Sequence, residues 1–511
     1  MAKRGFPVGG LKLALGPAFA ALTWILMPVD PQAPAASTTA GVAIWMGVWW
    51  LTEAVPLAVT SLLPLVFFPV LGVLPAGKVA GLYTNDVVFL FIGGFIVALA
   101  MEKWNLHRRI ALRVLLLAGA GPARTMIGFM AATALLSMWI SNTAATMMMI
   151  PIAMAVLVRY DAMVDSAMMR RYSIGLLLGI AYSASIGGIA TLVGTPPNLV
   201  FASLFPMSFP RGPEITFLQW MEFALPISIL LFVAASLLLY RMYARGVKGA
   251  GEREIFRGEL KEMGRMSHEE KGVLVVFLIL AVLWVTRESI GIGPVSIKGW
   301  AHLLPKPGYI GDGTVAILVS SLLFVIPSRQ RGEALMDWPT AKKLPWGIVL
   351  LFGGGFALAG AISQSGLSAM IGEKLQSLSS LPPIMMTAGI SVLMTFTTEL
   401  TSNTATTQMV LPILASVAQA LGRNPFYLMI PATISASCAF MMPVATPPNA
   451  IIFGTGRLRI ADMAKVGLIL NLIGAVIITL WLHLIGPAAF GGPPMQHPSW
   501  MDPPAVEMTA P

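Results

Sequence analysis

Charged residues and cysteine are scarce in this chain of 511 residues. Asp, Glu, Lys and Arg make up 11% of it, whereas soluble domains contain about 25%. Hydrophobic residues make up 56%, and many apolar runs exceed the roughly 18 residues that mark a membrane span. The composition therefore excludes a soluble protein built around one large core. The single cysteine, Cys438, excludes an intrachain disulfide.

Metal-binding and catalytic patterns are also missing from the sequence. No group of Cys and His residues has the spacing of a zinc, haem or iron–sulfur site. The Ser and Thr residues of the motifs described below have no His beside them, so an enzyme is not expected. The net charge of +10 indicates basic cytoplasmic loops, because membrane proteins place Lys and Arg on the inner side. In a chain this apolar, we prefer that interpretation to nucleic-acid binding.

Long apolar segments predict an all-α polytopic membrane protein with about eleven transmembrane helices and two re-entrant hairpins. Residues 1–39 carry the first helix, which we expect to be retained because no small-residue cleavage site follows it. The hairpins are expected at 124–157 and 383–420. The crossing segments are expected at 11–29, 40–58, 60–75, 86–104, 172–203, 218–242, 272–290, 311–327, 346–361, 425–455 and 464–485.

The distribution of basic residues predicts the orientation of these segments. With a cytoplasmic N-terminus, 26 of the 33 Lys and Arg residues fall on the inner side. Residues 243–271 then form a cytoplasmic linker between the halves. Residues 486–511, rich in Pro and Gly, are expected to be a disordered periplasmic tail. The seven basic residues expected outside are Lys78, Arg211, Arg287, Lys298, Lys306, Lys374 and Arg423.

Three motifs occur once in each half of the chain. Ser141-Asn142-Thr143 recurs as Ser402-Asn403-Thr404 at an offset of 261 residues, and Gly93-Gly94-Phe95 recurs as Gly354-Gly355-Phe356 at the same offset. Thr195-Pro196-Pro197-Asn198 recurs as Thr446-Pro447-Pro448-Asn449. The first copy starts from inside and the second from outside. We therefore predict inverted repeats, 40–242 and 272–485, with a transport site at their interface.

Small polar residues inside apolar segments predict backbone that is broken in mid-membrane around a cavity. Ser, Asn and Thr are good N-cap residues, so at a hairpin tip they end one half-helix and start the next. Pro after Thr suits a first helical turn and interrupts what precedes it, so we expect 172–203 and 425–455 to be broken helices. Amides and hydroxyls at four such tips would bind carboxylate oxygens, and carbonyl and side-chain oxygens would bind a hard cation such as Na⁺.

Two carboxylates in apolar surroundings, Glu53 and Glu399, are further candidates. Glu399 precedes Asn403 by four residues, a spacing from which it could orient the tip. The alternative for both is a structural hydrogen-bond acceptor. The run Met147-Met148-Met149 is interpreted as packing rather than as a metal site.

The repeated motifs resemble those of the divalent anion:sodium symporter family, the di- and tricarboxylate transporters. The resemblance covers about 40–485 and rests on residues 139–144, 194–198, 398–405 and 445–449. It implies a homodimer in which each protomer has a scaffold domain and a transport domain. It also implies an elevator mechanism, in which the transport domain slides against the scaffold. Scaffold helices would then lie at 40–104, and transport elements at 124–203 and 383–455.

The same resemblance implies the site residues. One sodium site would use Ser137, Ser141, Asn142 and Gly194. The other would use Thr398, Thr401, Asn403 and Ala445, although the family position assigned to Thr401 often carries a smaller residue. The substrate would contact Ser141, Asn142, Thr143, Ser402, Asn403, Thr404, Thr446 and Pro447.

The predicted function is that of a bacterial inner-membrane secondary transporter. It would import C4-dicarboxylates such as succinate, malate or fumarate, with Na⁺ as the coupling ion. The alternatives are Na⁺-independent dicarboxylate exchange, and transport of tricarboxylate or sulfate through the same site. An anion channel is less favoured, because the polar residues concentrate at one depth instead of forming a continuous path.

Overall fold

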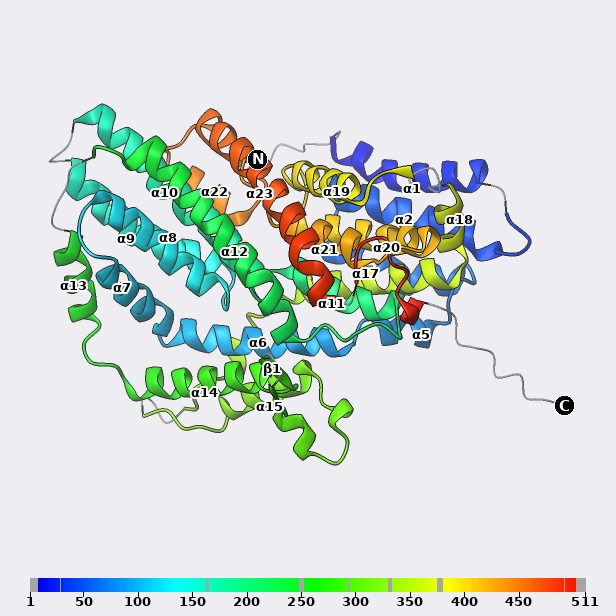
Figure 1. Cartoon of the computed structure of the whole chain (residues 1–511), viewed down its shortest axis with the longest axis horizontal. Helices are drawn as coiled ribbons and strands as arrows, with labels where there is room; N and C mark the ends of the chain where they lie inside the picture. Colours follow the sequence, from blue (N-terminus) through cyan, green and yellow to red (C-terminus); the bar gives the residue numbers. More distant parts are fainter. Residues whose placement is uncertain are drawn as a thin grey trace, which may run out of the picture.

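The computed structural model describes residues 8–27, 29–161, 165–247, 252–292, 295–329, 333–374, 380–490 and 492–501. These ranges are helical almost throughout (Figure 1). Within them, seven helical segments are long and apolar enough to cross a membrane, and five further apolar helices are shorter. The prediction of a helical, polytopic membrane protein is confirmed. The seven segments are Ala76–Lys103, Asn142–Tyr160, Ser166–Ile189, Phe217–Ala244, Trp346–Gln364, Asn403–Leu421 and Ile460–Ala489.

The N-terminal part of the chain begins with two helices that pack against each other, α1 and α2. The predicted segment 60–75 is interrupted: it contains the end of one short helix, α3, and a second one, α4. Pro64 lies in the first turn of α4, where it suits a helix start and disfavours helix before it. The helices of this part are α1 (Val8–Leu26), α2 (Pro34–Thr52), α3 (Leu57–Thr60), α4 (Leu63–Val70), α5 (Ala76–Leu82), α6 (Asp86–Lys103) and α7 (Leu106–Ala118).

Both predicted hairpins and both predicted broken helices are present. The hairpins are the pairs α8 with α9 and α19 with α20, and the broken helices are α10 with α11 and α21 with α22. In each pair, the second helix begins inside one of the repeated motifs. The bounds are α8 (Pro122–Ser137), α9 (Asn142–Asp161), α10 (Ser166–Ile189), α11 (Pro196–Ser208), α19 (Pro383–Thr398), α20 (Asn403–Leu421), α21 (Phe426–Ser435) and α22 (Pro447–Phe453).

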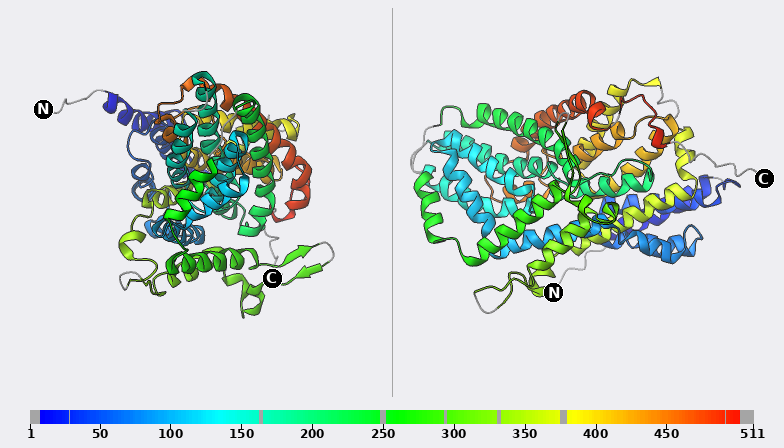
Figure 2. Two further views of the ribbon diagram at one scale, coloured as in Figure 1. Left: turned by 90° about the vertical axis from the view of Figure 1, so that its left-hand side faces the viewer. Right: turned by 60° about the horizontal axis from the view of Figure 1, so that its bottom comes forward.

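The middle of the chain connects the two halves and adds a layer along one side. Helices α14 and α15 and the two strands lie beside α6, outside the rest of the bundle (Figures 1 and 2). The elements are α12 (Phe217–Leu239), a π-helix (Tyr240–Ala244), α13 (Glu252–Glu262), α14 (His268–Val285), β1 (Ile290–Ile292), β2 (Val295–Ile297), 3₁₀ turns (Trp300–Leu303, Pro307–Tyr309), α15 (Asp312–Leu322), α16 (Trp338–Ala341), α17 (Trp346–Gln364) and α18 (Leu367–Lys374).

The strands correct the all-α expectation in one place. β1 and β2 form an antiparallel ribbon in which Ile290 pairs with Ile297. β-branched Ile and Val residues favour extended backbone, and a segment this short gives no hydrophobic period from which to predict it.

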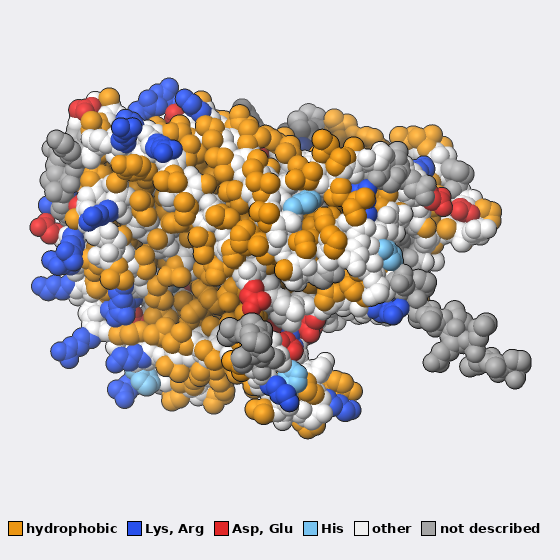
Figure 3. All heavy atoms as spheres, viewed as in Figure 1, with side chains coloured by type: hydrophobic (Ala, Val, Ile, Leu, Met, Phe, Trp, Pro, Cys, Tyr) orange, Lys and Arg blue, Asp and Glu red, His pale blue; other side chains and the backbone are white. Residues whose placement is uncertain are grey.

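One end of the molecule is basic, whereas most of the face drawn in Figure 3 is apolar. Lys and Arg side chains gather at the end that carries α7, α13 and the connection from α9 to α10 (Figures 1 and 3). A buried ion pair fixes this end internally: Arg109 Nε of α7 lies 2.7 Å from Glu270 Oε1 of α14. Nearby, a hydrogen bond from Lys103 lowers the pKa of the Asp337 carboxyl below its usual value.

The C-terminal segment is more ordered than the sequence suggests. Helix α23 spans Ile460–Ala489 and so passes the expected end at residue 485. Trp500, in a final 3₁₀ turn (Ser499–Met501), packs on Phe205, Phe209 and Phe426. For residues 486–490 and 492–501 the structure therefore differs from the expected disorder, because aromatic contacts hold this part of the tail. Residues 502–511 lie outside the described ranges.

Candidate substrate and cation site

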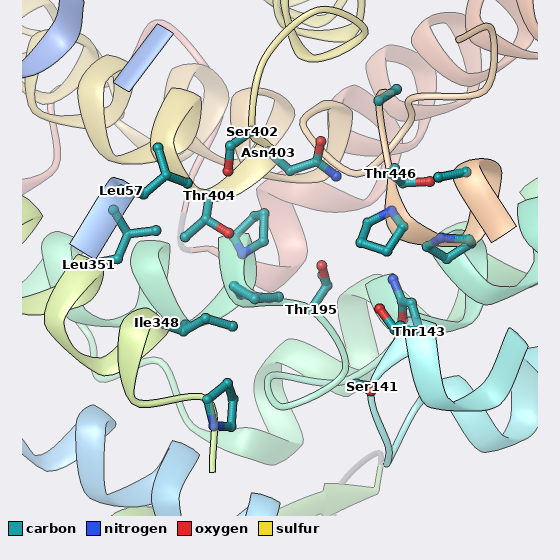
Figure 4. Close-up of a pocket in the computed structure, with 18 of the residues that line it drawn as sticks. Leu57, Ser141, Thr143, Thr195, Ile348, Leu351, Ser402, Asn403, Thr404 and Thr446 are labelled. Carbon is teal, nitrogen blue, oxygen red and sulfur yellow. The ribbon is translucent and has the colours of Figure 1, made fainter. Parts of the chain in front are cut away.

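All four repeated motifs meet at one cavity of about 1120 Å³. The hairpin tips and the breaks in the two discontinuous helices approach it from different directions (Figure 4). The motif residues that line it are Ser141, Asn142, Thr143, Thr195, Pro196, Pro197, Ser402, Asn403, Thr404, Thr446, Pro447 and Pro448.

The cavity has walls of different chemistry. The motifs contribute hydroxyl and amide groups, whereas Leu57 of α3 and Ile348 and Leu351 of α17 contribute only apolar side chains. Figure 4 shows these three on the side of the cavity away from Thr143 and Thr446. A polar solute would therefore find its hydrogen-bond partners on the motif-bearing elements.

The first tip is built around Asn142. The Ser137 hydroxyl donates a hydrogen bond to Asn142 Oδ1, which fixes the direction of the amide. In the same tip, the Ala144 N–H donates a hydrogen bond to Ser141 Oγ at 3.1 Å, so Ser141 caps the start of α9. Ser137 does not line the cavity itself and is fully buried behind the tip.

A small space beside Gly188 separates this tip from the break between α10 and α11. A Cβ atom placed on Gly188 would lie 2.9 Å from Asn142 Oδ1 and 2.9 Å from the Gly194 carbonyl oxygen. Two oxygens from different elements thus converge on one point that only a glycine leaves free. Asn198 shapes this break, because its Nδ2 donates to the carbonyls of Gly188, Ile189 and Thr191.

The second tip follows the same plan with different groups. The Thr398 hydroxyl lies within hydrogen-bond distance of Asn403 Oδ1 and of the Ala436 carbonyl. In the adjacent break, Asn449 Nδ2 donates to the carbonyls of Ala439 at 3.1 Å and Met442 at 3.0 Å. The counterpart of Gly188 is therefore Ala439, which carries a Cβ, so the two halves of the site are similar and not identical.

Glu399 connects the second tip to the broken helix. Its Oε1 accepts hydrogen bonds from the backbone N–H groups of Phe440 (2.7 Å) and Met441 (2.9 Å), and from Asn471 Nδ2 (2.7 Å). Its Oε2 accepts from the Met442 N–H at 2.9 Å. A carboxylate that is 3% exposed thereby holds three consecutive amides of the α21–α22 connection. The sequence suggested an orienting role for Glu399 without indicating these partners.

The structure brings nearly all the predicted residues to this cavity. The eight residues assigned to substrate line it, as do Gly194, Thr401 and Ala445 of the assigned cation sites. Ser137 and Thr398 lie behind the Asn residues that they contact. Glu53 also lines the cavity.

Three charged lining residues were not predicted from the sequence: Lys12, Glu102 and Lys343. Sequence reasoning missed them because they come from the start of α1, the end of α6 and the approach to α17. Lys12 Nζ donates to the Thr52 carbonyl at 3.0 Å, which holds this side chain at the cavity rim. No local signal distinguishes these residues from other charges at helix ends.

Two solved structures share this fold. The YdaH transporter of Alcanivorax borkumensis superposes with a TM-score of 0.57 at 14% identity, covering 95% of this chain and 99% of that one. MtrF of Neisseria gonorrhoeae superposes with a TM-score of 0.55 at 13% identity, covering 96% and 98%. The fold is thus one that membrane transporters adopt.

Comparison at the sequence level gives the family. Residues 12–488 match the family described as the sodium:sulfate symporter transmembrane region, and the chain belongs to it. It is 41% identical over 497 residues to the sodium-dependent dicarboxylate transporter SdcS of Staphylococcus saprophyticus, covering 96% of this chain and 93% of that protein. It is 42% identical over 498 residues to SdcS of Staphylococcus aureus, covering 96% and 94%. The prediction made from the motifs is confirmed at the level of the family.

Proposed function

We propose that this protein imports C4-dicarboxylates such as succinate, malate or fumarate across the bacterial inner membrane, coupled to Na⁺. The observation that carries the proposal is the convergence of both Ser-Asn-Thr tips and both Thr-Pro-Pro motifs on one cavity. The names of the SdcS relatives point to the same substrate class and the same coupling ion.

Four helix starts supply the environment for an anion. Helices α9, α11, α20 and α22 all begin at the motifs, so the positive ends of their dipoles lie at the cavity. Free N–H groups come from the starts of α9 and α20, because α11 and α22 each begin with two prolines, which have no N–H. Ser141, Asn142 and Thr143 would hold one carboxylate, and Ser402, Asn403 and Thr404 the other. Thr446 and Pro447 lie beside the second tip.

Bound cations would complete the neutralisation of the dianion. We assign one Na⁺ to Ser137, Ser141, Asn142 and Gly194, where Asn142 Oδ1 and the Gly194 carbonyl converge beside Gly188. A second Na⁺ is assigned to Thr398, Thr401, Asn403 and Ala445. Each cation makes the arrival of the anion more favourable, and the anion favours the cations to the same extent.

An elevator mechanism fits the two unlike walls of the cavity. A solute held by the motif-bearing elements 124–203 and 383–455 can move with them, while the apolar wall formed by α3 and α17 only seals the site. We assign the helices of 40–104 to the scaffold of a homodimer. With about eleven crossings and a cytoplasmic N-terminus, Lys12, Glu102 and Lys343 all lie at inner helix ends. The cavity then opens to the cytoplasm.

Radiolabelled succinate uptake into proteoliposomes tests the proposal, with the Na⁺ gradient and the internal dicarboxylate varied independently. Uptake that requires an inward Na⁺ gradient and no internal anion is the expected result. Uptake that ignores Na⁺ and needs internal dicarboxylate would replace symport by exchange. If citrate or sulfate competed for uptake and malate and fumarate did not, the substrate would be a tricarboxylate or sulfate and not a C4-dicarboxylate.

Alanine at either tip asparagine should abolish this uptake. Asn142→Ala and Asn403→Ala each remove an amide that serves both the anion and one cation, so both partners lose a ligand at once. The variants should reach the membrane at normal levels, because each retains the helix start that follows the tip. Membrane abundance and Na⁺-dependent uptake are measured together, and normal transport by both variants would refute the site.

A further inference from the structure

The two hairpins have closely similar sequences and are packed differently. Residues 141–151 and 402–412 align without a gap, and the alignment pairs Met147 with Gln408. Met147 of α9 is 60% exposed and lines the cavity. Gln408 of α20 is fully buried and lies outside the cavity. Equivalent positions in the two repeats thus have opposite environments.

The partner of Gln408 is the glycine-rich stretch of α17. A Cβ atom placed on Gly355 would lie 2.7 Å from Gln408 Cδ, so the amide rests directly against that glycine. Gly94 of α6 is the counterpart of Gly355 in the first repeat. A Cβ atom there would meet Val193 Cγ1 at 3.3 Å, and no Met147 atom is among its nearest neighbours.

The breaks in the discontinuous helices show the reverse pattern. The motif alignment pairs Val193 with Val444. Both residues line the cavity, but Val193 is 7% exposed and covers Gly94, whereas Val444 is 72% exposed. At these two glycines, α6 therefore contacts the first break and α17 contacts the second hairpin. The two remaining pairings are not formed in this structure: Met147 is not among the nearest neighbours of Gly94, and Val444 is not among those of Gly355.

Gln408 carries an unmet hydrogen-bonding requirement. Neither its Nε2 nor its Oε1 has a hydrogen-bond partner among the described residues, although both atoms are buried. A buried amide without partners is costly, and such a group needs an explanation beyond packing. Met147, in the equivalent place, has no polar group to satisfy.

We propose that Gln408 meets the solute on the outer face, in the opposite-facing state of the transporter. In that state the pairings exchange: Met147 covers Gly94, Val444 covers Gly355, and Gln408 leaves α17 to line a cavity open to the periplasm. The proposal rests on the proposed function, because it requires a site that faces each side in turn. It adds a chemical difference between the two entrances: an amide outside and a thioether inside.

The amide gives Gln408 a role that its counterpart cannot fill. Its two N–H donors suit a carboxylate approaching the second tip, where Thr404 lies one helical turn away and already lines the site. Met147 offers only a thioether, a weak acceptor that forms no hydrogen bond to an anion. We therefore expect Gln408 to raise the affinity for external dicarboxylate and to leave release on the inner side unaffected.

Exchange of the two residues provides a kinetic test with a matched control. Gln408→Met should raise the half-saturating external succinate concentration roughly fivefold, the loss expected for one hydrogen-bonding group. Met147→Gln should instead lower the half-saturating internal concentration, measured by efflux. If Gln408→Met left the half-saturating external succinate concentration unchanged, the proposed role of the amide would be wrong.

Thiol labelling tests the exposure independently of any transport measurement. In a Cys438→Ser background, the Gln408→Cys variant should react with a membrane-impermeant maleimide added outside, and the Met147→Cys variant only with reagent added inside. A position 408 that stays unreactive from outside, in protein whose parent transports succinate, would overturn the inference and leave the proposed function intact. Failure of the wild-type protein to transport dicarboxylate would remove the proposed function, while labelling would still decide whether Gln408 becomes exposed.

Discussion

Gly188→Ala is expected to abolish Na⁺-dependent succinate uptake at ordinary Na⁺ concentrations. The added methyl carbon would stand 2.9 Å from Asn142 Oδ1 and 2.9 Å from the Gly194 carbonyl, in the space where these oxygens converge. The Gly194 oxygen belongs to the backbone and cannot swing aside, so either the tip or the break must move. Displacing the groups around a metal ligand lowers affinity by about 10- to 100-fold. Uptake measured over a Na⁺ series should show a corresponding rise in the half-activating concentration.

Gly389→Ala is the matched control for this substitution. Like Gly188 of α10, Gly389 lies inside a helix of the motif-bearing elements, here α19 of the second hairpin, and a Cβ atom there would have no neighbour within 4 Å. Replacing it tests the general effect of a methyl group in such a helix without filling the site. If Gly188→Ala retained the wild-type Na⁺ dependence, no cation could sit between Asn142 and Gly194. The first Na⁺ assignment would then be withdrawn.

The positions of the breaks could be predicted from the sequence because local chemistry determines them. Asn142, Asn403, Pro196 and Pro447 each begin a helix in the structure, as their capping and ring constraints require. Apart from Ser137 and Thr398, the assigned residues also line one cavity, as the recurrence of the motifs in both halves led us to expect. These features depend only on residues within a few positions of each other and on the repeat.

Features that depend on tertiary contact could not be predicted in this way. Lys12 of α1 and Lys343 of the connection before α17 line the cavity, although neither lies in a repeated motif. The proposed role of Gly188 at the cation site could not be inferred from the sequence, because it depends on the distance from this residue to Asn142 Oδ1. Many other glycines in the chain have no comparable neighbour. The difference between Met147 and Gln408 is likewise invisible in the aligned sequences, because both residues are compatible with a buried helix face.

Glu399→Gln is expected to weaken Na⁺ activation by about tenfold, with a smaller effect on succinate affinity at saturating Na⁺. Both carboxylate oxygens accept N–H hydrogen bonds, from Phe440, Met441 and Asn471 on one side and Met442 on the other. A glutamine must present an NH₂ group to one of these donors, which leaves that donor unpaired and pushes the connection away. The displaced segment leads directly to Ala445, a proposed cation ligand. The same substitution removes a buried negative charge beside that cation, so both effects weaken its binding.

Thr191→Val is the corresponding variant in the first repeat. There the Thr191 hydroxyl donates to the Met138 carbonyl at 2.6 Å and accepts from the Gly194 N–H at 3.1 Å, so a hydroxyl takes the place of the carboxylate. Thr191→Val removes a neutral hydroxyl, whereas Glu399→Gln removes a negative charge. We therefore expect Thr191→Val to raise the half-activating Na⁺ concentration less than Glu399→Gln does. If Glu399→Gln lowered only the yield or melting temperature of the protein, with an unchanged Na⁺ curve, Glu399 would be a structural acceptor alone. A shifted curve in protein of normal stability would show that its charge and its three backbone contacts serve the second cation site.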